Sequence, residues 1–193
     1  IVWHDKVYSY QCLLDRVRLW RGTIRSERVE PGAVAVLEAD FSPNSIALFL
    51  ALIDSACIVV PLTSSVESKK PEFIGIAQGE VSFAIDGRDD VTVSRLSNNA
   101  NHQIYATLRE MGHPGLVVFS SGSTGKSKAV VHDMAGILEK FKVRRRRLRA
   151  ITFLLYDHLG GVNTMLYQLS NGGCIITVQD RSPDAVLSKV ERY

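Results

Sequence analysis

Cysteine is scarce in this chain, with three residues among 193. Cys12, Cys57 and Cys174 are odd in number, lie far apart and are mostly surrounded by apolar residues. A disulfide-stabilised fold would need a denser and more regular set of cysteines. We therefore expect reduced, buried thiols and a cytoplasmic protein.

The chain also lacks a strong excess of charge. Its formal net charge is +3, from 23 Lys and Arg against 20 Asp and Glu, and the two signs are spread along the whole length. Only the arginines at 144–147 and 149 form a dense run, which could suggest RNA or an acidic carrier. We expect this run at the end of a helix, where cations favour the dipole, and no aromatic residues alternate with it for base stacking. No nucleic-acid partner is predicted.

A membrane-spanning run is missing as well. The longest apolar stretch, 45–62, is short, carries Asp54 and has Pro61 near its end. It is better interpreted as a buried helix followed by a buried strand. No signal peptide opens the chain, and both ends read as cut, because the first residue is Ile and a helical pattern runs up to Tyr193. A soluble protein without a membrane span is predicted.

With 46% hydrophobic residues, the chain can fill one core or two small lobes. Helical spacing of apolar residues predicts helices over 10–24, 43–53, 103–110, 134–141 and 162–169, and another from 183. Short apolar runs predict strands at 33–37, 57–60, 81–85, 91–96, 116–119, 129–132, 151–155 and 174–178.

This alternation of strands and helices predicts an α/β fold, with mainly parallel sheets flanked by helices and ligands at the carboxyl ends of the strands. The glycines and proline around 112–115 break the pattern. We place a lobe boundary there, which gives two sub-lobes, 1–113 and 114–193.

The segment 120–128 carries the chemistry. It reads Ser-Ser-Gly-Ser-Thr-Gly-Lys-Ser-Lys and follows the apolar run 116–119 directly. Glycines let the backbone curl so that several N–H groups face one concavity, hydroxyls add donors, and lysines supply positive charge. Flexible linkers share this composition, but a linker would rarely lie between two buried strands. The segment therefore predicts a loop that holds the polyphosphate of a nucleotide.

A P-loop is the obvious competitor, because Gly125, Lys126 and Ser127 match the second half of G-x-x-x-x-G-K-[ST]. Ser120 stands where the first glycine belongs, and 129–132 reads as a strand where a P-loop requires a helix. A P-loop-like nucleotide triphosphatase or phosphotransferase stays as an alternative, as does a noncatalytic nucleotide-binding module.

The same segment closely resembles the signature loop of the adenylate-forming superfamily, [TS]-S-G-[ST]-T-G-x-P-K-G. This superfamily includes acyl- and aryl-CoA synthetases, adenylation domains of nonribosomal peptide synthetases, and luciferases. Here Ser127 replaces the proline and Ala129 the last glycine. Proline offers no N–H, so its loss removes no phosphate contact. Residues 7–13, 51–62 and 153–161 resemble further motifs of the family, so the likeness covers essentially all of the chain.

The resemblance implies part of the N-terminal domain of such an enzyme. In the implied reaction, a small carboxylic acid attacks ATP to give acyl-adenylate and pyrophosphate, and a thiol then takes the acyl group. Coenzyme A is the expected acceptor, with a carrier-protein thiol left open. Fatty, aromatic and amino acids all remain possible substrates, and the apolar residues 153–155 favour an apolar acid, as in fatty acid metabolism.

The resemblance also implies the residues that act. The nucleotide-binding residues would be Ser120, Ser121, Gly122, Ser123, Thr124, Gly125, Lys126 and Lys128. Of the two lysines, Lys128 matches the family's lysine, whereas Lys126 occupies a variable position. Thr124, Lys128 and His158 would act in catalysis.

His158, Gly160 and Gly161 would form the substrate pocket, with His158 as a gate rather than a base. On local grounds alone, His158 could instead cap a helix and the glycines could form a helix-entry turn.

Magnesium is implied with ATP, but no segment in this sequence matches the family's Tyr-Gly-x-Thr-Glu motif, its later ribose-binding Asp or its C-terminal lysine domain. Its ligands are expected after residue 193, and no metal site is predicted within the chain. The remaining histidines have no metal-ligand spacing. The 193 residues alone are therefore expected to be inactive.

Overall fold

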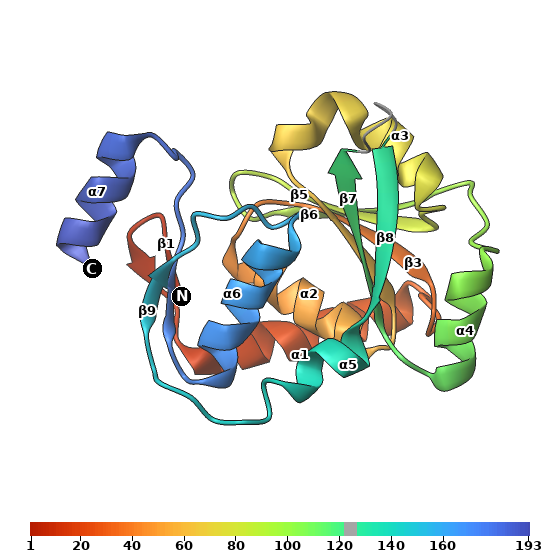
Figure 1. Cartoon of the computed structure of the whole chain (residues 1–193), viewed down its shortest axis with the longest axis horizontal. Helices are drawn as coiled ribbons and strands as arrows, with labels where there is room; N and C mark the ends of the chain where they lie inside the picture. The colour runs from red at the N-terminus through yellow and green to blue at the C-terminus, as the bar shows by residue number, and fades with distance from the viewer. Residues whose placement is uncertain (122–126) are drawn as a thin grey trace.

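A computed structural model describes residues 1–121 and 127–193. Its strands, in chain order, are β1 (Val2–Trp3), β2 (Lys6–Val7), β3 (Val34–Glu38), β4 (Ile58–Leu62), β5 (Val81–Ile85), β6 (Val91–Arg95), β7 (Gly115–Ser121), β8 (Ser127–Asp133), β9 (Arg149–Ile151) and β10 (Cys174–Ile176). Its helices are α1 (Tyr10–Ser26), α2 (Pro43–Asp54), the 3-10 helix η1 (Ser64–Lys69), α3 (Lys70–Ile76), α4 (Gln103–Met111), α5 (Met134–Glu139), α6 (Leu159–Ser170) and α7 (Pro183–Arg192). The predicted α/β class is confirmed (Figure 1).

Two sheets organise the molecule. The larger has the strand order β6-β5-β3-β4-β7-β8, with parallel pairs in the middle and an antiparallel strand at each edge. The smaller has the order β2-β1-β10-β9. Strands from both sides of residue 113 enter each sheet, since β7 pairs with β4 and β1 pairs with β10. The predicted division between residues 113 and 114 therefore does not coincide with the division between the sheets, and it stays a prediction.

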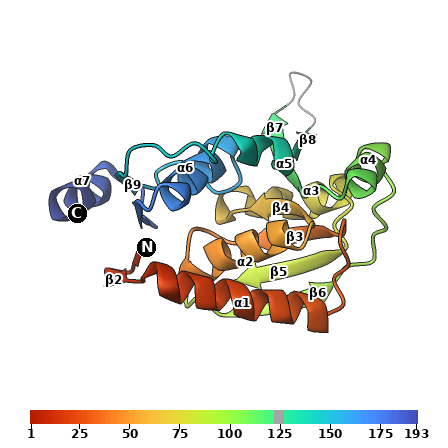
Figure 2. The same ribbon diagram turned by 90° about the horizontal axis from the view of Figure 1, so that it is seen from below.

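Alternating side chains of the central strands fill two cores, one on each face of the larger sheet. Ala35 and Leu37 of β3 pack with α1, α2, α5 and α6. Val34 and Val36 pack on the opposite face with α3 and α4. Figure 2 shows α1 and α2 running side by side. The long apolar run that ends at Leu62 separates into α2 and β4, as predicted, and no described helix has the length and apolarity needed to cross a bilayer.

The strand predicted at 151–155 is wrong beyond its first residues. Only Arg149–Ile151 pair with β10, and Thr152 adds one more backbone bond to Ile176. The chain then turns away from the sheet, and the side chains of Phe153 and Leu154 are 54% and 51% exposed. An apolar run shows that burial is favourable, but it does not show that a partner strand is present.

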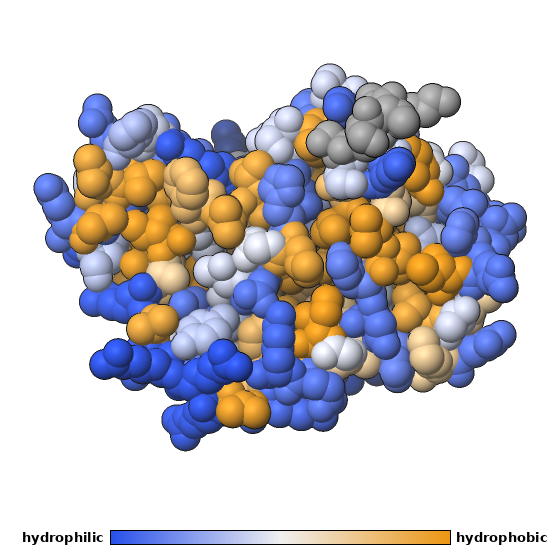
Figure 3. Space-filling view, in the orientation of Figure 1, coloured by the Kyte–Doolittle hydropathy of each residue, from blue (hydrophilic) through white to orange (hydrophobic). Residues whose placement is uncertain are grey.

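The arginine run is not at a helix end, and that prediction is corrected. Helix α5 stops at Glu139, before Phe141, and the arginines at 144–147 follow in an irregular segment that leads to β9. All five arginines are exposed. Tyr167 holds the segment by donating its hydroxyl to the carbonyl oxygen of Arg146 at 3.2 Å. In Figure 3 a hydrophilic band lies along the lower left edge of the molecule, where this segment runs in Figure 1.

The three thiols are free. Cys57 is buried, and this burial raises the pKa of its thiol to about 12, so the group stays protonated and weakly nucleophilic at neutral pH. Cys12 and Cys174 are half-buried.

Candidate functional site

The β7–β8 hairpin brings together the two ends of the predicted phosphate loop. The strands pair antiparallel, with Ser120 opposite Lys128 and Ser121 opposite Ser127. Buried residues such as Leu116 and Val117 hold β7 in the core. Gly122, Ser123, Thr124, Gly125 and Lys126 lie outside the described residues. Among the predicted phosphate contacts, the structure therefore places Ser120, Lys128 and the backbone of Ser121.

The element that follows residues 120–126 distinguishes a P-loop from the phosphate loop predicted here. Residues 127–133 form strand β8, as predicted, whereas a P-loop leads into a helix. Helix α5 begins only at Met134. The P-loop interpretation is therefore wrong for this chain.

A cavity of about 220 Å³ opens beside the hairpin. Its walls come from β4, η1, α3, both hairpin strands and the entry to α6, and its lining residues are Leu62, Val66, Lys69, Phe73, Phe119, Ser120, Ser127, Asp157 and His158. The structure thus brings His158 to the same cavity as Ser120, 38 residues earlier in the chain. Lys128 is exposed on β8 and is not among the residues that line the cavity. As the cross-strand partner of Ser120, it shares that residue's face of the hairpin.

The apolar side of this cavity is built by an aromatic pair. The rings of Phe73 and Phe119 stack with their centroids 3.9 Å apart and their planes 8° apart. Phe73 comes from α3 and Phe119 from β7, so the pair joins two elements that the sequence separates widely. The cavity combines this flat apolar wall with serine hydroxyls and a histidine.

His158 stands at the N-cap position of α6, but its side chain caps none of the helix N–H groups. The side chain is 61% exposed. The sequence left open that this histidine caps the helix. The imidazole does not do so. The ring is available to the cavity that it lines.

Asp157 is a site residue to which the sequence assigned no role. Its carboxylate is buried, with 7% of the side chain exposed. The Oδ2 atom accepts hydrogen bonds from the backbone N–H of Thr63 at 3.3 Å, from the Thr63 hydroxyl at 2.7 Å and from the Ser65 hydroxyl at 3.4 Å. Asp157 thus ties the entry to α6 to the start of η1. The only local signal was an aspartate beside a predicted site histidine.

Gly160 and Gly161 do not line this cavity. A Cβ atom on Gly161 would lie 2.0 Å from the carbonyl oxygen of Leu155, so this glycine is required by close backbone packing. A Cβ on Gly160 would meet only the end of the Leu154 side chain, at 3.0 Å. These contacts match a helix-entry turn, the second role that the sequence allowed.

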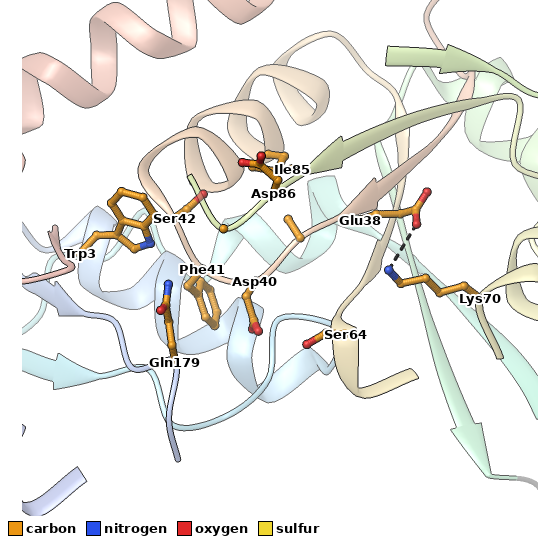
Figure 4. A pocket seen from close by; sticks show the side chains of 12 residues that line it. Trp3, Glu38, Asp40, Phe41, Ser42, Ser64, Lys70, Ile85, Asp86 and Gln179 are labelled. Atoms are coloured by element: carbon orange, nitrogen blue, oxygen red, sulfur yellow. Dashed lines mark ion pairs between the residues drawn. The ribbon is translucent and has the colours of Figure 1, made fainter. Parts of the chain in front are cut away.

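A second cavity, of about 360 Å³, lies at the carboxyl ends of β3 and β5 (Figure 4). Of its charged lining groups, Lys70 pairs with Glu38 at 3.4 Å, and Asp40 pairs with Arg181, which lies outside the lining, at 3.0 Å. Burial opposes the charge of Lys70, but Glu67 and Glu38 outweigh it and raise the pKa of this lysine. The sequence singled out none of these residues. No three His, Cys, Asp or Glu side chains converge on a metal position within 1–121 or 127–193.

Comparisons with known proteins bear on the whole chain. A family model described as AMP-binding enzyme matches residues 1–193. The chain is 24% identical over 191 residues to the hybrid PKS-NRPS synthetase 1 of Dothistroma septosporum, a match that covers 88% of this chain and 5% of that protein.

Solved structures share the fold. The N-terminal subdomain of Klebsiella oxytoca NpsA, in complex with 3-hydroxyanthranilyl-AMSN, matches with a TM-score of 0.74 at 17% identity, over 98% of this chain and 52% of that one. The o-succinylbenzoate CoA synthetase MenE of Bacillus subtilis, in complex with its acyl-adenylate intermediate, gives 0.71 at 14% identity, over 99% and 55%. The chain spans about half the length of these structures.

Proposed function

The chain belongs to the AMP-binding enzyme family, and from that premise we propose that it binds ATP and a carboxylic acid in an enzyme that joins them. A carboxylate oxygen of the acid attacks the α-phosphorus of ATP, the bond from that phosphorus to the bridging oxygen breaks, and pyrophosphate leaves. The product is an acyl-adenylate. The observation that carries the proposal is the strand-loop-strand hairpin, whose serine ends open onto the cavity that contains His158.

The barrier in this step is electrostatic, because an anionic carboxylate must approach a polyanionic nucleotide. We assign Ser120, Ser121 and the loop residues Gly122, Ser123, Thr124 and Gly125 to the β- and γ-phosphates. Lys128 supplies the compensating charge and stabilises the leaving pyrophosphate. Its position opposite Ser120 supports this role, since the two side chains share one face of the hairpin.

We assign the acid to the cavity beside the hairpin. Its volume of about 220 Å³ and its aromatic wall suit a small apolar or aromatic acid. His158 closes the cavity as a gate. Magnesium is proposed as the partner of ATP; within 1–121 and 127–193, no three His, Cys, Asp or Glu side chains converge on a position for it.

In the second step a thiolate attacks the acyl carbonyl carbon, and the bond to the adenylate oxygen breaks to release AMP. We propose coenzyme A as the thiol. The similarity to MenE, a CoA synthetase, agrees with this choice. A carrier-protein thiol is the second candidate, favoured by the similarity to a hybrid PKS-NRPS synthetase.

Exchange of labelled pyrophosphate into ATP tests the first step in the natural full-length protein. We expect exchange that depends on added acid, and a loss of about 100-fold in Lys128→Ala, the size expected when a charge-stabilising group is removed. Lys6→Ala is the matched control, because Lys6 is exposed on β2 in the other sheet, and it should exchange normally.

Two results would contradict the assignment. ATP turnover without any acid would indicate a phosphotransferase or triphosphatase, and ATP binding without either reaction would indicate a noncatalytic module. The acceptor is identified separately, by testing whether coenzyme A or a pantetheinylated carrier protein releases AMP from the preformed adenylate.

A further inference from the structure

The carboxylate of Asp157 has one oxygen engaged and one without a partner. Three hydrogen bonds from Thr63 and Ser65 end on Oδ2. The Oδ1 atom is buried and has no hydrogen-bond partner among the described residues. An unpaired buried acceptor is unfavourable, and more so when the group is charged. A donor for Oδ1 is therefore the missing part of this site.

The imidazole of His158 is placed to be that donor. Its Nε2 atom lies 3.7 Å from Oδ1, just beyond hydrogen-bond distance. A movement of less than about 1 Å would bring the two atoms to the usual separation for N–H and O. The ring can make this movement because it is 61% exposed and caps no helix N–H.

The other oxygen connects Asp157 to η1, which also lines the cavity. Thr63 is fully buried and is the N-cap of η1, the element that contributes Val66 and Lys69 to the lining. Asp157 is itself buried and lies directly before α6. One carboxylate thus links two of the elements that line the cavity, η1 and the entry to α6.

We propose that Asp157 is a positioning residue for His158: its Oδ1 accepts a hydrogen bond from the Nε2–H of the imidazole and holds the ring across the cavity mouth. The inference rests on the proposed function only in taking this cavity as the acid site. In this role Asp157, which also lines the cavity, acts through the ring of His158. It selects the tautomer of His158 with the proton on Nε2 and limits the ring to one orientation.

The tautomer is measured by nitrogen-15 NMR of the imidazole in the natural full-length protein, at pH 8.5, where an ordinary imidazole is neutral. His158→Gln identifies the signal. We expect the Nε2–H form to predominate in the wild-type protein and to lose its preference in Asp157→Asn, whose amide can present a donor to Nε2. A wild-type ring with its proton on Nδ1, or one without a preferred tautomer, overturns the proposal even if the variant does not fold.

Kinetics separate positioning from a structural role. Asp157→Asn should raise KM for the acid about tenfold, the effect of losing one hydrogen bond to a charged group, and leave KM for ATP unchanged. Thr63→Val is the matched control, because it removes the 2.7 Å bond to Oδ2 and leaves Oδ1 intact. It should keep the tautomer and the acid KM.

Equal effects of the two variants on the acid KM would overturn the proposal, since Asp157 would then only brace the turn. An unchanged acid KM in Asp157→Asn would overturn it too. Absence of acid-dependent exchange in the wild-type protein would instead count against the proposed function, while the tautomer would still decide the role of Asp157.

Discussion

At the scale of single residues, two adjacent glycines, Gly160 and Gly161, differ in how closely other atoms approach them. Gly160 and Gly161 both begin α6, yet only Gly161 faces backbone at a distance that leaves no room for a Cβ atom. The sequence indicated that both glycines could matter, but it did not indicate which one the fold requires. That depends on Leu154 and Leu155, which approach the glycines only in the folded turn. Steric room, which no local pattern reports, decides which glycine is required.

We predict that Gly161→Ala lowers the free energy of unfolding by about 1–3 kcal/mol, as overpacking does, because the carbonyl of Leu155 must move. Gly160→Ala should change it by less than about 1 kcal/mol, since the Leu154 side chain can turn aside and alanine favours the helix. Urea unfolding of both variants measures the difference. Equal losses would show that the turn is not packed as described.

Asp157 shows the limit of sequence reasoning at this scale. Its hydrogen-bond partners, Thr63 and Ser65, lie 94 and 92 residues away in the chain. Nothing local to 153–161 indicates that they meet. His158, by contrast, could be assigned to a pocket from the family resemblance, and the structure places it at a cavity shared with Ser120.

At the scale of elements, local chemistry predicts helix starts well. Ser42 and Pro43 indicated the beginning of α2, and the structure has a capping box there: the Ser42 hydroxyl accepts from the N–H of Ser45 at 3.0 Å, and the Ser45 hydroxyl accepts from the N–H of Ser42 at 2.8 Å. Such signals lie within four residues, so they can be read directly. The bounds of β9 were mispredicted because they depend on pairing with β10, which comes much later in the chain.

We predict that Ser42→Ala lowers the free energy of unfolding by about 1 kcal/mol, the usual cost of losing an N-cap. Ser182→Ala is the control at another helix start. Ser182 also caps, but through an exposed contact of 3.4 Å to Ala185 at α7, so its loss should be smaller. Thermal or urea unfolding ranks the two. A larger effect at Ser182 would contradict the importance assigned to the buried cap.

At the scale of the whole molecule, Tyr156 joins the segment after β9 to the core that the larger sheet forms with α1 and α2. It is fully buried, its ring lies 4.5 Å from Phe41 and 5.7 Å from Phe49, and its hydroxyl donates to the carbonyl oxygen of Ser45 at 3.0 Å. Burial raises the pKa of this tyrosine well above its usual value. The residue therefore connects regions that the sequence assigned to separate sub-lobes.

We predict that Tyr156→Phe costs about 1 kcal/mol of stability, because it leaves the carbonyl of Ser45 without this donor. Tyr156→Ala should cost about 3–5 kcal/mol, the range for removing a buried aromatic ring. Unfolding followed by tryptophan fluorescence and by circular dichroism measures both. Unchanged stability in Tyr156→Ala would show that the two regions are held together by other contacts.

The central claim is that the β7–β8 hairpin holds a polyphosphate. It is tested most directly by titrating the nitrogen-15-labelled chain with ATP, with pyrophosphate and with AMP, and following the amide signals of residues 120–128. We expect ATP and pyrophosphate to shift these signals and AMP to shift them far less. Lys128→Ala should weaken binding about tenfold, as loss of a charged hydrogen bond does. Signals that none of the three ligands shifts would contradict it.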